Sequence, residues 1–154
     1  MSDETTVREA IQADCESVLP LAKAMATSFE VEKDAFILSF SDISKDPAAV
    51  CFVAENGGEI IGYLLGFEHR AFYANGCVSW VEEIFVKADL RRMGIGKKLM
   101  DRFETWCMDR GSCLVGLATR RASGFYNSIG YEESAIFFRR LLKRNAQPGE
   151  AGNA

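Results

Sequence analysis

Glycines and cationic side chains gather in the segment DLRRMGIGKKLM, residues 89–100. It follows the apolar run VEEIFV and precedes an amphipathic stretch, which indicates a loop that enters a helix. The first N–H groups of a helix lack partners within it and carry the positive end of its dipole, so they favour an anion. Gly94 and Gly96 would let this backbone approach the anion closely, because neither has a Cβ. The segment therefore predicts a phosphate-binding turn.

Positive charge is concentrated on this segment. Residues 87–98 hold five lysines and arginines and one aspartate, whereas the whole chain has a formal net charge of −4. Two common phosphate loops do not fit. A P-loop needs a glycine where this chain has Arg91 and a Ser or Thr where it has Lys98, and a dinucleotide fingerprint needs a glycine in place of Leu99. The remaining pattern is Arg91-x-x-Gly94-x-Gly96.

Two adjacent carboxylates and a tyrosine could supply acid–base chemistry. Glu82 and Glu83 lie in an apolar run, and burial raises the pKa of a carboxyl, which suits a base near neutral pH. A strand sends neighbouring side chains to opposite faces, so only one of them should face a cleft unless a bulge re-aims it. Ala122, Tyr126 and Ile129 share one helix face by spacing. Solvent-exposed glutamates and a core tyrosine bonded to a carbonyl are the alternatives.

The elements that must position these residues form a mixed α/β pattern. Helices are predicted over 15–29 with Asp14 as the cap, around 32–43, from the glycine segment to about 110, and over 120–130 with Gly130 as the stop. Strands are predicted over 5–11, 49–55, 59–69, 77–86, 113–119 and 131–142, with a hairpin at Asn56, Gly57 and Gly58.

Length and composition limit the number of domains, the location of the protein and the ligands that it can bind. The length of 154 residues predicts a single domain over 1–154, with a core of about 5–143 and a disordered tail at 145–154. No apolar run approaches the roughly 20 residues of a membrane helix, and the acidic start lacks the features of a signal peptide, so we expect a cytoplasmic protein that is not bound to a membrane. Five scattered cysteines and one histidine favour neither disulfides nor a metal site. The net negative charge disfavours nucleic acid.

The glycine pattern resembles the pyrophosphate loop of the GNAT superfamily of acyl-CoA-dependent N-acetyltransferases, Arg/Gln-x-x-Gly-x-Gly/Ala. The stretch ASGFYNSIGY also matches that family's late motif, at Ala122, Phe125, Tyr126, Gly130 and Tyr131. The two motifs stand at the family's separation, and the resemblance covers about residues 5–143. It implies the GNAT-like fold, an α/β (α+β) architecture whose central twisted mixed β-sheet is splayed in the middle and flanked by helices, with the pantetheine arm of acetyl-CoA in the split.

The resemblance also implies roles for individual residues. Glu82 would act as base, Glu83 would contact the substrate, as in the acidic pair of the family's diamine acetyltransferases, and Tyr126 would protonate the departing thiolate. The backbone of the strand residues would pair with pantetheine, and the loop would hold the pyrophosphate. The implied cofactor-binding residues are Ile84, Phe85, Val86, Arg91, Arg92, Met93, Gly94, Ile95, Gly96 and Lys97.

The implied activity is transfer of an acetyl group from acetyl-CoA to a primary amine by direct attack in a ternary complex, without a metal. The acidic surplus outside the glycine loop favours a small cationic amine, such as a polyamine or an aminoglycoside. Acetylation of protein N-terminal or lysine amines, and a non-catalytic acyl-CoA-binding regulatory module, remain alternatives, and a homodimer is left open. Thr119 stands where many relatives have an asparagine, which argues against the branch that acetylates protein N-termini.

Overall fold

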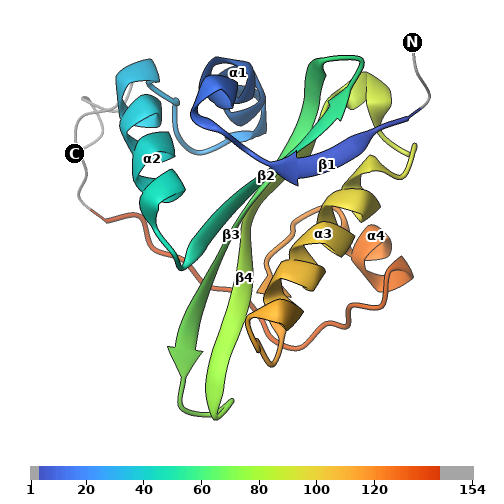
Figure 1. Ribbon diagram of the computed structural model, residues 1–154. Helices are drawn as coiled ribbons and strands as arrows, with labels where there is room; N and C mark the ends of the chain where they lie inside the picture. The colour runs from blue at the N-terminus through green and yellow to red at the C-terminus, as the bar shows by residue number, and fades with distance from the viewer. Residues whose placement is uncertain (1–3, 143–154) are drawn as a thin grey trace.

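The structure is a computed structural model that describes residues 4–142. Five strands form one sheet in chain order (Figure 1). The first four strands pair antiparallel, and the last pairs parallel with its neighbour. This arrangement confirms the predicted mixed sheet. The strands are β1 (Thr6–Glu9), β2 (Ala49–Asn56), β3 (Glu59–Ala71), β4 (Gly76–Val86) and β5 (Val115–Leu117).

Helices cover both faces of the sheet (Figure 1). Alternation along the strands divides the core in two: Phe52 and Leu64 pack toward α3, and Val53 and Tyr63 pack toward α1 and α2. Gly66 lies where a Cβ would stand only 2.2 Å from the Phe103 ring, so α3 can lie close against β3. The helices are α1 (Cys15–Met25), α2 (Lys33–Lys45), α3 (Ile95–Asp109) and α4 (Ser123–Ser128), with short 3-10 turns η1 (Gln12–Asp14) and η2 (Ala88–Leu90).

The predicted hairpin between β2 and β3 is confirmed. Its turn residues Gly57 and Gly58 both have positive φ, 58° and 82°, the conformation that tight two-residue hairpin turns require and that glycine adopts without strain. A bulge follows in β3: Glu55 pairs with Ile60 and Ala54 with Gly62, so Ile61 is the extra residue. Beyond this bulge Tyr63 pairs with Val53, and both pack toward α1 and α2.

The parallel pair at the edge of the sheet is short. Ser79, Trp80 and Val81 of β4 pair with the three residues of β5, whereas β4 continues for five more residues to Val86. Along those five residues β4 has no second strand partner within the described chain. β4 and β5 are therefore paired over three residues only, and the part of β4 beyond Val81 forms a splayed edge of the sheet. The prediction was a splay in the middle of the sheet.

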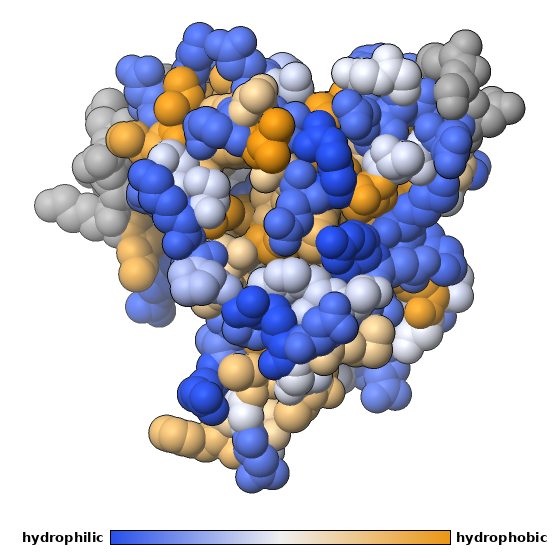
Figure 2. Space-filling view, in the orientation of Figure 1, coloured by the Kyte–Doolittle hydropathy of each residue, from blue (hydrophilic) through white to orange (hydrophobic). Residues whose placement is uncertain are grey.

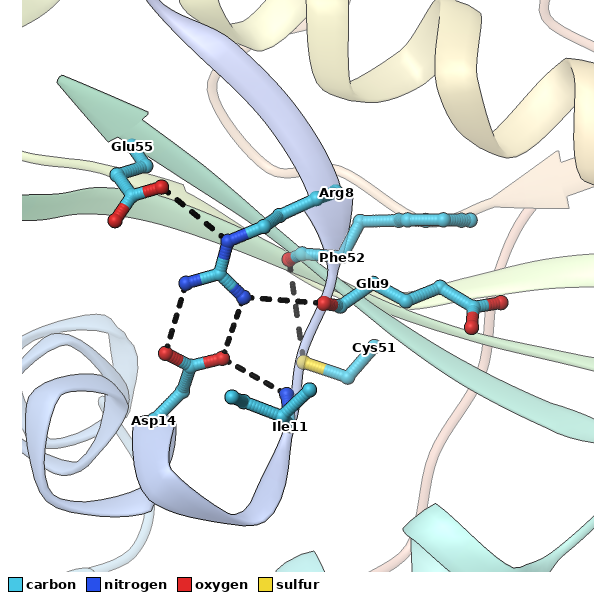
Figure 3. A network of polar contacts seen from close by, with 7 residues as sticks. All are labelled: Arg8, Glu9, Ile11, Asp14, Cys51, Phe52 and Glu55. Carbon is cyan, nitrogen blue, oxygen red and sulfur yellow. Dashed lines mark hydrogen bonds and ion pairs between the residues drawn. The ribbon is translucent and has the colours of Figure 1, made fainter. Parts of the chain in front are cut away.

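The prediction that Asp14 caps α1 is wrong. Asp14 stands at the start of α1, but its side chain makes no capping hydrogen bond to the helix. Its carboxylate accepts two hydrogen bonds from Arg8, at 2.8 and 3.0 Å, and one from the Ile11 backbone N–H at 2.8 Å (Figure 3). Arg8 also donates to Glu55 at 3.3 Å. The Arg8 guanidinium competes for the Asp14 carboxylate better than a backbone N–H of α1 would, because the hydrogen bonds from Arg8 are charge-assisted and bidentate. Asp14 thus ties β1 to the turn before α1.

The prediction of a final strand over 131–142 is wrong. The segment forms neither helix nor strand, and residues 132–142 make no backbone hydrogen bond with other described residues. A β-rich sequence becomes a strand only when an adjacent edge accepts its backbone groups, and the short β5 is not paired with it. The tail predicted at 145–154 lies outside the described residues.

Candidate active site

The start of α3 offers three free backbone donors. The first intrahelical bond runs from the Lys98 N–H to the Gly94 carbonyl at 3.1 Å, and no side chain caps the helix. The N–H groups of Ile95, Gly96 and Lys97 consequently have no acceptor within the helix. These donors and the positive end of the helix dipole lie where the glycine pattern predicts an anion site.

The loop before α3 alternates in handedness. Arg92 has φ 67° and Gly94 has φ 80°, whereas Met93 between them has no positive φ. Such alternation turns successive N–H groups toward a common point, as in anion-binding nests. A left-handed arginine is uncommon and costs about 1 kcal/mol or more, and such strain is typical of functional loops.

The structure explains in different ways why Gly94 and Gly96 are glycines. Gly94 adopts the left-handed conformation that a Cβ disfavours, and a Cβ there would meet no atom within 4 Å. Gly96 is helical, and its Cβ would lie 3.4 Å from the Phe125 ring, an ordinary contact. Only Gly94 is therefore required by backbone conformation, and the absence of a Cβ at Gly96 keeps the approach to its N–H open.

The cationic side chains of the segment are largely engaged by the protein itself. Arg91 donates from Nε to the Val86 carbonyl at 3.1 Å and lies over the Phe85 ring, 5.2 Å from its centre. Lys97 pairs with Asp101 at 2.7 Å, and Lys98 donates to the Thr5 carbonyl at 3.1 Å. Arg91, Lys97 and Lys98 are thus less available to an anion than the backbone donors at the start of α3 are.

Residues 84–86 lie on the part of β4 that extends beyond β5. Ile84 and Val86 pack toward α3, and Phe85 packs toward α1 and α2. The Val86 carbonyl already accepts the bond from Arg91. Apart from that acceptor, the edge of β4 over 84–86 has no second strand partner among the described residues.

A bulge separates the two neighbouring carboxylates. Leu65 pairs with Glu83 and Gly66 with Val81, so Glu82 is the extra residue in β4. Glu82 is exposed and follows directly after the last residue that pairs with β5. Glu83 is half-buried on the α1 and α2 face.

A cavity of about 600 Å³ lies between α1, α2 and the sheet. In Figure 2 the surface is hollowed in this area, with hydrophobic residues at depth and hydrophilic residues around them. Glu83 lines the cavity and accepts a hydrogen bond from the Tyr63 hydroxyl at 2.7 Å. Burial, together with the charge of Glu83, raises the pKa of Tyr63, which keeps its phenol a donor. No described Lys, Arg or His lines the cavity. The lining includes four glutamates, which are Glu9, Glu30, Glu32 and Glu83.

A cysteine also lines this cavity. Burial, followed by the charge of Glu83, raises the pKa of Cys51 to about 12, so its thiol stays protonated at neutral pH and is a poor nucleophile. The five cysteines form no disulfide. Sequence reasoning missed Tyr63 and Cys51 as cavity residues, because both lie in strongly apolar runs that read as ordinary core strands.

Tyr126 is buried on α4, against α3 and next to Phe125 and Tyr131. Burial raises its pKa, so the phenol is protonated at neutral pH. No described residue hydrogen-bonds its hydroxyl, which disfavours the alternative of a core tyrosine bonded to a carbonyl. Thr119, the position that departs from many relatives, accepts a hydrogen bond from the Ala122 N–H at 3.1 Å and so supports the start of α4.

The predicted site residues thus fall on two faces of one sheet. Tyr126 packs on the α3 face, whereas Glu83 lines the cavity on the α1 and α2 face. The splayed edge beyond Val81, where Glu82 lies, connects the two faces. A molecule held along that edge could reach the start of α3 at one end and the acidic cavity at the other.

The part of the chain that the structure describes contains neither a metal-binding group nor a membrane-spanning helix. Within residues 4–142 no three His, Cys, Asp or Glu side chains are grouped to hold a metal ion. No helix there has both the length and the apolar character to cross a membrane.

Comparisons with known proteins give the fold and the family of this chain. Thialysine N-epsilon-acetyltransferase of Bos taurus is 27% identical over 143 residues, which cover 82% of this chain and 84% of the relative. A transcriptional regulator from Bacillus halodurans superposes with a TM-score of 0.81 at 24% identity, over 90% of this chain and 100% of the other. The acetyltransferase AAC(6')-Iy, solved with the bisubstrate analog CoA-S-monomethyl-acetylneamine, superposes with a TM-score of 0.75 at 22% identity, over 90% and 99% of the two chains.

The fold of the two solved structures is therefore the fold of this chain, and the family is shown by sequence. The model of the Acetyltransferase (GNAT) family matches residues 15–131, most of the chain. The protein belongs to the Acetyltransferase (GNAT) family and is an acyl-CoA-dependent N-acetyltransferase.

Proposed function

We propose that the protein transfers an acetyl group from acetyl-CoA to a primary amine of a small cationic molecule, polyamine-like or aminoglycoside-like, by direct attack in a ternary complex. The observation that carries this proposal is the cavity on the α1 and α2 face. It has an apolar floor, and its lining includes Glu9, Glu32 and Glu83 and no described cation. Such a lining favours a positively charged ligand and disfavours an acidic one.

The described residues fit acetyl-CoA as co-substrate. The free N–H groups of Ile95, Gly96 and Lys97 would hold the pyrophosphate, and the β4 edge over 84–86 would hold the pantetheine arm. When bound, acetyl-CoA supplies an acyl group activated as a thioester. The solved relative AAC(6')-Iy binds a CoA-containing analog, which supports this assignment.

Glu82 and Glu83 have separate roles in the proposal. An alkyl amine has a pKa of roughly 10, so it must lose a proton before it attacks. Glu82 lies at the splayed edge, next to the predicted position of the thioester, and takes this proton directly or through a water. Glu83 lies deeper in the cavity, where Tyr63 fixes its carboxylate, and orients the cationic acceptor.

Tyr126 donates the proton that the departing thiolate requires. Its raised pKa keeps the phenol protonated, and its hydroxyl is not committed to a described protein acceptor. Its position on α4, one turn after the Thr119-supported start, places it on the same face as the α3 loop.

A panel of amines, followed by release of free thiol from acetyl-CoA, tests this proposal. The panel contains polyamines, an aminoglycoside, thialysine, lysine, and a peptide with a free N-terminus. We expect turnover with polycationic small molecules and weak or no turnover with the peptide. Faster turnover with the peptide would favour the protein-acetylating alternative. Binding of acetyl-CoA without thiol release from any amine would favour a regulatory module.

A further inference from the structure

Packing, rather than hydrogen bonding, holds the side chain of Tyr126 in place. No described residue hydrogen-bonds its hydroxyl. Two rings pack against it in T-shaped arrangements: Phe125, with ring centres 5.0 Å apart and planes at 68°, and Tyr131, with centres 5.9 Å apart and planes at 69°. Aromatic pairs favour this geometry, but it does not by itself direct the hydroxyl. The position of the Tyr126 hydroxyl therefore depends on where its two neighbours are held.

Both neighbours link α4 to α3, which lies beside it (Figure 1). Phe125 packs at the start of α3, where its ring would lie 3.4 Å from a Cβ on Gly96. Tyr131 reaches further along α3, where its hydroxyl donates to Oε2 of Glu104 at 2.8 Å. Gly96 and Glu104 are roughly 12 Å apart along the helix, at 1.5 Å per residue. The ring of Tyr126 is thus held by two neighbours with separate anchors on α3.

Of the two anchors, the hydrogen bond of Tyr131 is the directional one. Its acceptor is a carboxylate, so the bond is charge-assisted and stronger than a bond between neutral groups. Burial, together with the bond to Glu104, raises the pKa of Tyr131, so its phenol remains a donor at neutral pH. The Tyr131 N–H also donates to the Tyr126 carbonyl at 2.9 Å. Tyr131 therefore contacts Tyr126 through its ring and through its backbone.

The shortness of α4 makes these contacts important for its orientation. The helix has six residues, Ser123–Ser128. Isolated helices shorter than about 12 residues are marginal in water, so the orientation of α4 depends on what it packs against. After the helix, Gly130 has a positive φ of 96°, which turns the chain back and brings Tyr131 against α3.

We propose that Tyr131, held by Glu104, is a positioning residue for the transfer of a proton from Tyr126. This role rests on the proposed function, in which Tyr126 is the acid. In that step the proton passes from the Tyr126 hydroxyl oxygen to the thiolate sulfur of CoA, and water returns a proton to the phenolate. Tyr131 and Glu104 exchange no proton with the substrates. They hold Tyr126 at a fixed place relative to α3, the start of which would bind the pyrophosphate of the same co-substrate.

A contact that only stabilises α4 is the competing interpretation. Loss of such a contact would lower the melting temperature, and it would change turnover by the same factor whether or not residue 126 has a hydroxyl. Loss of a positioning contact would lower turnover only while that hydroxyl is present. The two interpretations therefore differ in how substitutions at Tyr131 and Tyr126 combine.

A double-mutant cycle in the full chain separates the two interpretations. It compares wild type, Tyr131→Phe, Tyr126→Phe and the double variant by release of thiol from acetyl-CoA with one accepted amine. A small misplacement of a reacting group lowers its rate strongly, so Tyr131→Phe should lower kcat about 10-fold. Tyr131 lies outside the acidic cavity and the α3 loop, so KM for the amine and the affinity for acetyl-CoA should stay within about 2-fold of wild type. In the Tyr126→Phe background, Tyr131→Phe should change kcat by less than about 2-fold.

Two substitutions of Glu104 test the anchor and leave the Tyr131 ring in place. Glu104→Ala removes the acceptor and should lower kcat as Tyr131→Phe does, whereas Glu104→Gln keeps an oxygen acceptor and should retain most of the turnover. Thr105→Val is the matched control, because it removes another side-chain hydrogen bond of α3, to the Asp101 carbonyl at 3.1 Å, at an exposed position. It should have wild-type kcat. Thermal melts show whether each variant is folded under the assay conditions.

The outcomes distinguish the positioning role from the proposed function. Wild-type kcat in Tyr131→Phe and Glu104→Ala, when Tyr126→Phe lowers it, would overturn the positioning role and leave Tyr126 as the acid. An equal loss in both backgrounds would also overturn it, in favour of a structural contact. Wild-type kcat in Tyr126→Phe would remove the acid and the positioning role together. A loss of kcat that occurs only when the Tyr126 hydroxyl is present, with Glu104→Gln close to wild type, supports the positioning role.

Discussion

The hydroxyl of Tyr63 donates a hydrogen bond to Oε1 of Glu83 at 2.7 Å, across strands β3 and β4 and inside the acidic cavity. The bond orients one carboxylate oxygen and leaves the other for a ligand. Glu83 is half-buried and lies next to the bulge in β4. The register of the strand alone would set the direction of its side chain only coarsely, so the hydrogen bond from Tyr63 fixes that direction.

Replacing Tyr63 by Phe should therefore loosen Glu83 without emptying the core. We expect KM for the amine to rise more than kcat falls, with acetyl-CoA affinity unchanged and about 1 kcal/mol of stability lost with the hydrogen bond. Steady-state kinetics and thermal melts measure these effects. Tyr131→Phe is the matched control, since it removes a phenol–glutamate bond of 2.8 Å, to Glu104, outside the cavity. Equal amine KM changes in both variants would contradict the role of Tyr63.

Substitutions of the two carboxylates should separate their functions. Glu82→Gln should lower kcat by ~10²-fold, the usual contribution of a general base, and remove the acidic limb of its pH profile. Glu83→Gln should mainly raise KM for a cationic amine and change kcat less. Kinetics with one accepted amine over a range of pH distinguish the two patterns. The opposite distribution of effects would exchange the proposed roles.

Substitutions of Gly94 and Gly96 should differ in their effect on the stability of the protein. Gly96→Ala should weaken acetyl-CoA binding at least ~10-fold by obstructing the donors at the start of α3, while stability stays within about 1 kcal/mol of the wild type because the position is helical. Gly94→Ala should lose about 1–2 kcal/mol of stability as well, since its φ of 80° disfavours a Cβ. Calorimetric titration and melts measure binding and stability separately. Unchanged affinity in the Gly96 variant would exclude this turn as the pyrophosphate site.

Tyr126→Phe should lower turnover by ~10²-fold or more and leave acetyl-CoA affinity nearly unchanged. Its stability should change little, because no described residue accepts a bond from the hydroxyl. Burial raises the pKa of Tyr126, so the wild-type alkaline limb should lie above the ordinary range of a tyrosine, and the variant should lack that limb. Wild-type turnover with any accepted amine would end the assignment of Tyr126 as the acid.

Stability should fall in acid through Asp14. Hydrogen bonding to Arg8 lowers the pKa of Asp14 below its usual value of 3.8, so the folded state binds this proton less readily than the unfolded state does. The stabilisation is complete above that usual value and is lost as the pH falls through the lower folded pKa. Asp14→Asn should therefore cost about 1–3 kcal/mol at neutral pH and reduce the acid-dependent loss. Urea melts at several pH values test this, and an unchanged acid slope in the variant would contradict it.

The sequence by itself was sufficient for features that a few adjacent residues specify. The Gly57 and Gly58 turn, the free donors at the start of α3 and the helix face that Tyr126 occupies all follow from backbone preferences or from helical spacing over one or two turns. Together with the match between two short motifs and a known family, these local signals predicted the fold class.

Features that depend on how distant segments meet were decided by tertiary structure. Glu83 meets Tyr63 from 20 positions away, and the bulge that separates Glu82 from Glu83 exists only in the register between β3 and β4. The strand expected over 131–142 did not form for the same reason, because strand propensity needs an edge to pair with and the sequence does not say where that edge will be. Local pattern sets what a segment can become, and the burial and pairing available in the folded chain set what it does become.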